Sequence, residues 1–177
     1  MGRVVSLAQA RAQKMARTAF GRWPQRLGHR PRPEERLADL PSHVLGALAE
    51  LKHQATLALY DVVLGVHGWG PGERFYNLEA RAKLEALDAF LFLADQVRWE
   101  LMHRLGWLAE GPAQKYSILD LASRNRAIQA EFGPEPPRLT EDYPGFERVR
   151  RRLKIEPEAV VRSLIPQALA AFKEHLA

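Results

Sequence analysis

The sequence contains no cysteine, and this absence excludes disulfide bonds, thiolate metal sites and cysteine nucleophiles. It also lacks an apolar run close to the roughly 20 residues that a membrane-spanning helix needs. Asp61, Asp88 and Asp95 interrupt the most apolar stretches. The N-terminal stretch has no continuous apolar segment of the kind that a secretory signal carries. We therefore expect a cytoplasmic protein with no membrane span.

Acidic residues are absent from residues 1–33, which carry eight basic side chains. The whole chain has a formal net charge of +5, so the remainder is mildly acidic. Residues 21–41 hold four prolines and two glycines, a composition typical of a linker or of an extended segment laid over a folded body. The sequence predicts a basic N-terminal arm and proline-rich linker over residues 1–41 and a helical bundle domain over residues 42–177. The arm is either a binding segment for an acidic surface or a solvated, partly disordered tail.

The alternating apolar pattern of a β-strand is absent, whereas helical patterns recur along the chain. Residues 77–107 contain no proline and a single glycine near their end, and we expect one long helix there with Asn77 as its N-cap. A second long helix is expected over residues 42–66, and the glycine-rich residues 67–76 predict a tight connection. The predicted fold is all-α: a helical bundle built on a long antiparallel αα-hairpin, with shorter C-terminal helices.

Apolar residues recur along the long helix at steps of three and four, which predicts the stripe that faces the core. Its members are Ala80, Leu84, Leu87, Leu91, Ala94, Leu101 and Leu105. Arg98 occupies the one polar position in this stripe, and a buried guanidinium needs a partner. We expect Asp95 or Asp120 to supply it, and Asp88 is a further polar residue beside the aliphatic wall. This group is either an internal clamp or a site for an anion or a partner.

Two Glu-x-x-His pairs, at positions 50–53 and 100–103, have the spacing with which helical bundles hold metal ions. In the expected hairpin the pairs are offset by about 10 Å, whereas paired catalytic metals lie only about 3.5–4 Å apart. A single metal ion held by His43, Glu100 and His103 is a remaining candidate. Apart from that candidate, we expect no cofactor.

A dense basic cluster extends from Arg148 to Lys154. It is either a solvated patch or, together with the N-terminal arm, a surface that binds phosphate backbones without reading the base sequence. The nucleic-acid candidates are Arg11, Lys14, Arg17, Arg148, Arg150, Arg151, Arg152 and Lys154.

Phe92, Trp99 and Trp107 lie off the predicted stripe and are candidate anchors for a second helix layer or for a partner, since aromatic residues are enriched in interface cores. No hydroxyl residue stands in a recognisable nucleophile motif. We favour a non-enzymatic helical interaction or scaffold protein that forms a homo-oligomer or binds a protein partner. The alternatives are a nucleic-acid-binding protein that uses the arm and the basic cluster, and a metal- or anion-dependent helical-bundle enzyme.

Overall fold

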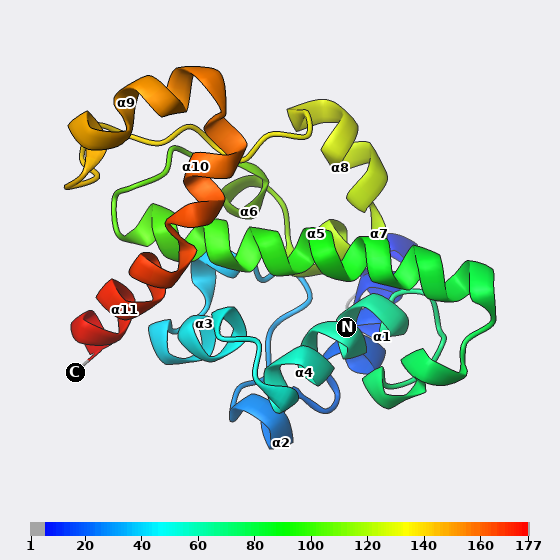
Figure 1. Cartoon of the computed structure of the whole chain (residues 1–177). Helices are drawn as coiled ribbons and strands as arrows, with labels where there is room; N and C mark the ends of the chain where they lie inside the picture. The colour runs from blue at the N-terminus through cyan, green and yellow to red at the C-terminus, as the bar shows by residue number, and fades with distance from the viewer. Residues whose placement is uncertain (1–5, 177) are drawn as a thin grey trace.

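Helix α5, Ala80–Arg104, crosses the middle of the molecule, and the other helices pack around it (Figure 1). This computed structural model describes residues 6–176. The preceding helices are α1 Leu7–Phe20, α2 Trp23–Leu27, α3 Ser42–Ala49 and α4 His53–Gly65, with short 3₁₀ helices η1 Leu37–Asp39 and η2 Gly72–Asn77. The following helices are α6 Pro112–Lys115, α7 Ile118–Ser123, α8 Asn125–Phe132, α9 Phe146–Ile155, α10 Pro157–Ser163 and α11 Ile165–Leu176. The described residues form no β-strand, which confirms the predicted all-α class.

The helix predicted over residues 42–66 is divided into α3 and α4. The chain breaks at Leu51, whose φ of 52° lies in the left-handed region that a leucine rarely adopts. Thr56 Oγ1 donates a hydrogen bond to the Leu51 carbonyl and steadies the turn. The break allows α3 to pack against α5 and α11 while α4 packs against α1 and α5. No glycine or proline marks the break, so its position was not evident from the sequence; the antiparallel hairpin itself stays a prediction.

The core face of α5 agrees with the predicted stripe at Ala94 and Leu101, which are buried, but differs from it in the first half of the helix. Leu84, Leu87 and Leu91 are 68%, 37% and 54% exposed. The residues that α5 buries are largely Ala82, Ala86, Ala89, Phe90, Leu93, Ala94, Val97, Leu101 and Met102. Because much of this helix is apolar, choosing the line with the most leucines selected the outer side, and the alanine-rich side packs inward. No helix between residues 6 and 176 combines the length and the apolar composition needed to cross a membrane.

Helix α1 packs closely on α4 through small residues. Ala19 and Phe20 are buried, and a Cβ placed on Gly65 would lie only 2.7 Å from the Ala19 Cα. The small side chains of α1 and Gly65 therefore let the backbones of α1 and α4 come into contact. The Trp23 indole is fully buried and donates a hydrogen bond of 3.0 Å to the Ala58 carbonyl. This part of the predicted arm is packed on the bundle, and the boundary at residue 41 stays a prediction.

Candidate functional site

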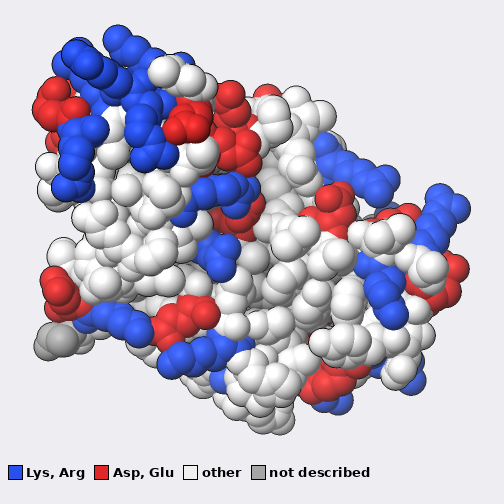
Figure 2. Space-filling view, viewed as in Figure 1, with Lys and Arg blue, Asp and Glu red and all other residues white. Residues whose placement is uncertain are grey.

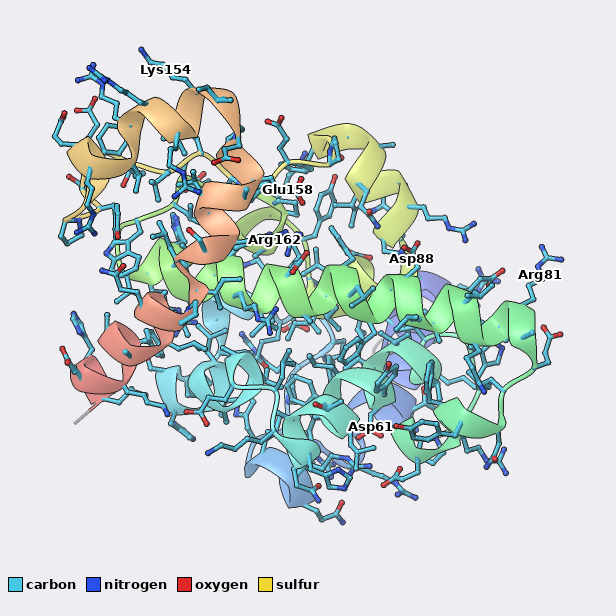
Figure 3. All side chains as sticks on the ribbon, viewed as in Figure 1. Asp61, Arg81, Asp88, Lys154, Glu158 and Arg162 are labelled. Atoms are coloured by element: carbon cyan, nitrogen blue, oxygen red, sulfur yellow. The ribbon has the colours of Figure 1, made fainter. Side chains whose placement is uncertain are left out.

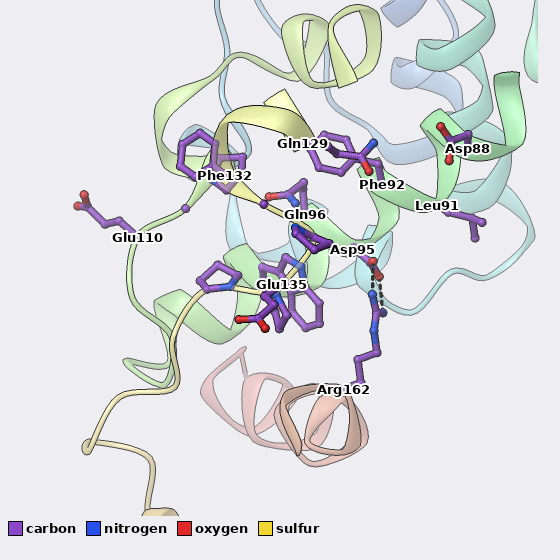
Figure 4. A pocket seen from close by; sticks show the side chains of 17 residues that line it. Asp88, Leu91, Phe92, Asp95, Gln96, Glu110, Gln129, Phe132, Glu135 and Arg162 are labelled. Atoms are coloured by element: carbon purple, nitrogen blue, oxygen red, sulfur yellow. Dashed lines mark hydrogen bonds and ion pairs between the residues drawn. The ribbon is translucent and has the colours of Figure 1, made fainter. Parts of the chain in front are cut away.

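The structure does not bring Arg98 to its expected partners. Asp95 is bound instead by Arg162 of α10, at 2.9 and 2.7 Å from the two guanidinium nitrogens (Figure 4). Arg98 is partly buried, and its Nε has no hydrogen-bond partner among the described residues. Asp120 lies elsewhere, in an open groove between α1 and α7 that Arg11 also lines. The expected Arg98–aspartate clamp is wrong because residues of α11 pack beside Arg98 and Asp95 turns towards α10.

The proposed metal ligands are also separated by other contacts. Glu100 is 2% exposed and accepts hydrogen bonds from Arg104 and from Gln114. His103 Nδ1 lies 2.8 Å from the Leu108 carbonyl oxygen, to which it donates. His43 lines a different cavity, between α3 and α11. Within residues 6–176 no three His, Asp or Glu side chains converge as a metal site would require.

Arg104 explains why Glu100 is buried. Its Nη2 donates to the carbonyl oxygens of Leu37, Ala38 and Leu40, at 2.8 to 3.1 Å, while its Nε donates to Glu100. The guanidinium therefore holds the end of η1 against α5, and the carboxylate of Glu100 balances its charge. This acid has a structural role in joining elements far apart in the chain.

Two of the candidate anchors are buried within the chain. The Trp107 ring packs edge-on against Tyr143, with 4.8 Å between ring centroids. Trp99 is 4% exposed, and the Arg162 guanidinium lies 5.4 Å from its ring centroid. These two tryptophans anchor the helices that follow α5, which is the second helix layer that the sequence analysis considered. Phe92 remains half-buried.

The basic candidates form two separate surfaces. The candidates on α9, from Arg148 to Lys154, are exposed and gather at one corner of the molecule (Figure 2). Arg150 pairs with Glu147 at 3.6 Å, and Arg152 pairs with Glu156 at 3.0 Å. The basic residues of α1 are exposed on a helix that packs on α4 and α7, away from α9. The structure therefore does not join the arm and the α9 cluster into one surface.

Four of the candidate residues line one cleft, which we call the α5 cleft. Asp88, Phe92, Asp95 and Trp99 occur on α5 at steps of four, three and four, so they share one side of the helix. The opposite wall is formed by the end of α8 and by residues 133–137, and the cleft has a volume of about 370 Å³ (Figure 4). The end of α8 and residues 133–137 therefore cover the polar and aromatic side of α5.

The far wall follows from local sequence. Gly133 has a φ of 81°, a left-handed conformation that ends α8 and turns the chain. The prolines at 134, 136 and 137 then keep the segment extended. A Cβ on Gly111 would lie 2.7 Å from Pro137 Cγ, so a glycine at position 111 lets this segment approach closely. The three prolines thus leave this wall little conformational freedom.

The α5 cleft is acidic. Four acidic residues, Asp88, Asp95, Glu110 and Glu135, are among the residues that line it, together with a single basic residue, Arg162. Arg162 is bound to Asp95 and, at 3.1 Å, to Glu158. The hydrogen bonds to Asp95 are the main reason that the pKa of Arg162 lies above its ordinary value, with a further contribution from Glu158.

Gln96 adds an unpaired acceptor to this cleft. Its side chain lines the cleft and is 5% exposed, and its Oε1 is buried without a hydrogen-bond partner among residues 6–176 (Figure 4). Leaving a buried polar group unpaired costs about 1–3 kcal/mol. The sequence analysis missed Gln96, Glu110, Glu135 and Arg162. Gln96 lies four residues after Phe92 and three before Trp99, so helical spacing alone could have placed it beside them. Glu110, Glu135 and Arg162 come from other segments and reach the cleft only through the tertiary structure.

Comparison of the chain with protein-family models, with curated proteins and with solved structures gives no match.

The side chains of the α5 cleft offer negative charge, aromatic surface and an amide. Its lining contains no histidine, lysine, serine or tyrosine that could act with a carboxylate as a nucleophile or proton shuttle. Asp95 is held by Arg162, which removes one of the four carboxylates from other roles. A ligand could contact these side chains through charge, aromatic surface and hydrogen bonds.

The exposed leucines of α5 lie next to this cleft. Leu84, Leu87 and Leu91 follow one another at steps of three and four on the outer side of the helix, and we call them the leucine row. Leu91 also lines the α5 cleft. Helix α5 therefore carries two adjacent features, the apolar leucine row in its first half and the acidic cleft around its middle.

Proposed function

We propose that this chain is a non-enzymatic helical interaction protein that self-associates through the leucine row of α5. The observation that carries the proposal is the exposure of Leu84, Leu87 and Leu91 on one line of the longest helix. Burying a leucine side chain contributes about 1.5–3 kcal/mol relative to leaving it in water. Three of them in a row favour a partner that covers them together.

An antiparallel pairing of two α5 helices satisfies this surface. Steps of three and four are the spacing with which helices interlock side by side. With the two-fold axis near Leu87, Leu84 of one copy faces Leu91 of the other, so that the surface complements itself. In this register Arg81 of one copy lies opposite Ala94 of the other, beyond the leucine row, so the proposed pairing rests on the three leucines.

The test is the solution mass of the protein as a function of its concentration, measured by sedimentation velocity. We expect the unmodified chain to form a dimer and the double variant Leu84→Glu, Leu87→Glu to remain a monomer. This variant leaves Leu91, and with it the α5 cleft, unchanged. Ile155→Glu is the matched control, because Ile155 is 84% exposed on α9 and should leave the dimer intact. A monomeric unmodified chain, or a dimer that survives both leucine substitutions, would contradict the proposal.

A second candidate function is nucleic-acid binding through α9. Arg148, Arg151 and Lys154 are exposed and form no ion pair with any residue between 6 and 176. Such a surface attracts phosphate backbones and releases counterions on binding. The test is fluorescence anisotropy with a labelled DNA or RNA duplex. Binding that weakens with salt and is lost in the triple glutamine variant at these positions would support this function. Unchanged binding in that variant would exclude α9 as the surface.

A further inference from the structure

We propose that the α5 cleft binds a cationic group, an alkylammonium or guanidinium carried on a short apolar stem. The proposal rests on the joint presence of unpaired carboxylates, an aromatic floor and the unpaired Gln96 acceptor in one cleft. It does not rest on self-association, although Leu91 belongs both to the leucine row and to the lining of the cleft.

Part of the acidic charge of the cleft is left unpaired. Glu110 and Glu135 line its rim and form no ion pair with any residue that the structure describes. Arg162 does not neutralise them, since its guanidinium is already bound to Asp95 and Glu158. Asp88 has only a distant pair, 4.0 Å from Arg126. An anion would be repelled here, whereas a cation gains from several carboxylates at once.

The floor of the cleft suits the stem and the charged end of such a ligand. The Arg162 guanidinium covers the buried Trp99 ring, 5.4 Å from its centroid. The aromatic surface that remains for a ligand is therefore that of Phe92 and Phe132. A volume of about 370 Å³ lies at the small end of ligand pockets, and it accommodates a side chain or a small amine rather than a large cofactor.

Gln96 selects for a hydrogen-bond donor. Its Oε1 is an acceptor, and a ligand can satisfy it only with an N–H or O–H group. Ammonium and guanidinium groups carry several N–H donors, so one ligand can bind Gln96 and a rim carboxylate together. The proline-containing wall is already in place, so little ordering is required on binding.

The experiment is an NMR titration of the full chain, in which the Trp99 indole and the Gln96 side-chain amide report on the cleft. The probes are n-butylammonium, the blocked amino acid Nα-acetyl-lysine methylamide, and its neutral analogue Nα-acetyl-norleucine methylamide. We expect both cations to shift these two signals and the neutral analogue to leave them unchanged. Tighter binding of the lysine derivative assigns a basic side chain of a peptide as the natural ligand, and tighter binding of butylammonium assigns a free amine.

Variants separate recognition from general charge. The pair Glu110→Gln and Glu135→Gln should weaken cation binding by about five- to tenfold. The matched pair Glu147→Gln and Glu174→Gln removes two exposed acids outside the cleft and should leave binding unchanged. Gln96→Leu should lose affinity without losing stability, since the unpaired acceptor is removed. Equal shifts with the neutral analogue, no shift with either cation, or unaltered affinity in the rim pair would each overturn the proposal.

Discussion

Arg26 and Asp61 form a buried ion pair that joins the segment before α3 to the middle of α4 (Figure 3 labels Asp61). Arg26 Nε lies 2.6 Å from Asp61 Oδ2, and Arg26 Nη2 lies 3.2 Å from Oδ1. The Gly72 backbone N–H donates to the same carboxylate at 2.7 Å. Burial opposes the charge of Arg26, but the hydrogen bonds to Asp61 and Glu73 outweigh it and raise the pKa of the guanidinium. The pair connects three segments through one carboxylate.

Replacing Arg26 with Met should destabilise the protein severely. The side chains of Arg26 and Asp61 are 7% and 3% exposed, and removing one partner of such a pair costs about 3–5 kcal/mol because a buried charge is left alone. Urea unfolding at neutral pH measures this loss. Arg22→Met is the control, since the Arg22 side chain is 55% exposed and should contribute less than about 1 kcal/mol. Equal stability of the two variants would mean that the buried pair does not hold the segment in place.

Gly65→Ala should be destabilising although it replaces a glycine near a helix end. The new Cβ would lie 2.7 Å from the Ala19 Cα and 2.9 Å from the Ala19 nitrogen, and backbone atoms cannot move aside cheaply. We expect a loss of about 1–3 kcal/mol, as in other overpacked sites. Gly46→Ala in α3 is the matched change, because its new Cβ would meet only side chains at 3.5 Å. That variant should be neutral or more stable, and thermal unfolding of both compares them.

The strain at Leu51 predicts an unusual order of stability. Leu51→Gly and Leu51→Ala both remove the side chain, but only glycine adopts a φ of 52° without steric cost. The glycine variant should therefore be more stable than the alanine variant by about 1 kcal/mol, the reverse of the order within a helix. Chemical denaturation of the two proteins measures the difference. A more stable alanine variant would show that the chain does not hold this turn.

The pair between α3 and α11 predicts a pH dependence. Glu50 lies 2.7 Å from Lys173 and 2.9 Å from Lys52, and hydrogen bonds from these lysines lower the pKa of its carboxyl below the ordinary 4.5. As the pH falls, the Glu50 carboxyl is protonated in the unfolded chain before it is protonated in the folded protein. The pair therefore contributes its full stabilisation above the ordinary pKa of 4.5, and this contribution is lost as the pH falls through the lower pKa of the folded protein. Glu50→Gln should be less stable than the unmodified protein at neutral pH.

The difference in stability between the unmodified protein and the Glu50→Gln variant should disappear as acid protonates the Glu50 carboxyl. Unfolding midpoints measured from neutral pH down through the ordinary pKa of a glutamate follow it directly. Glu174→Gln, an exposed change on α11, serves as the control. A difference in stability that stays constant over this range would exclude the ionised pair as its source.

The sequence supported the fold class but not the orientation of its main helix. Proline positions and helical periodicity are local signals: Pro157 is the first residue of α10, and Pro166 stands in the first turn of α11, where its missing N–H is tolerated. The orientation of α5 depends on which neighbours cover it. Ala86 and Leu87 are both apolar, and only the packing of α4 and α7 makes the first buried and the second exposed.

Half of the α5 cleft could be derived and half could not. Asp88, Asp95 and Trp99 share a side of one helix, and this follows from spacing alone. Arg162 reaches Asp95 across 67 positions of sequence, and no periodic pattern connects them. The sequence analysis paired Asp95 with Arg98 because they are close in the chain, whereas the structure pairs it with an arginine of another helix. Closeness in sequence did not identify the partner of Asp95, because the guanidinium of Arg162 on another helix binds it instead.

The contact between Trp23 and α4 has a consequence for the order in which the protein is made. Trp23 donates its hydrogen bond to Ala58, 35 positions later, and Arg26 finds Asp61 at the same separation. During synthesis, α1 and α2 therefore leave the ribosome before the helix on which they pack exists. Their basic residues and the indole of Trp23 stay accessible to other molecules for that interval. Completion of α4 covers the Trp23 indole, so a chaperone that recognises this indole would meet it on the growing chain only.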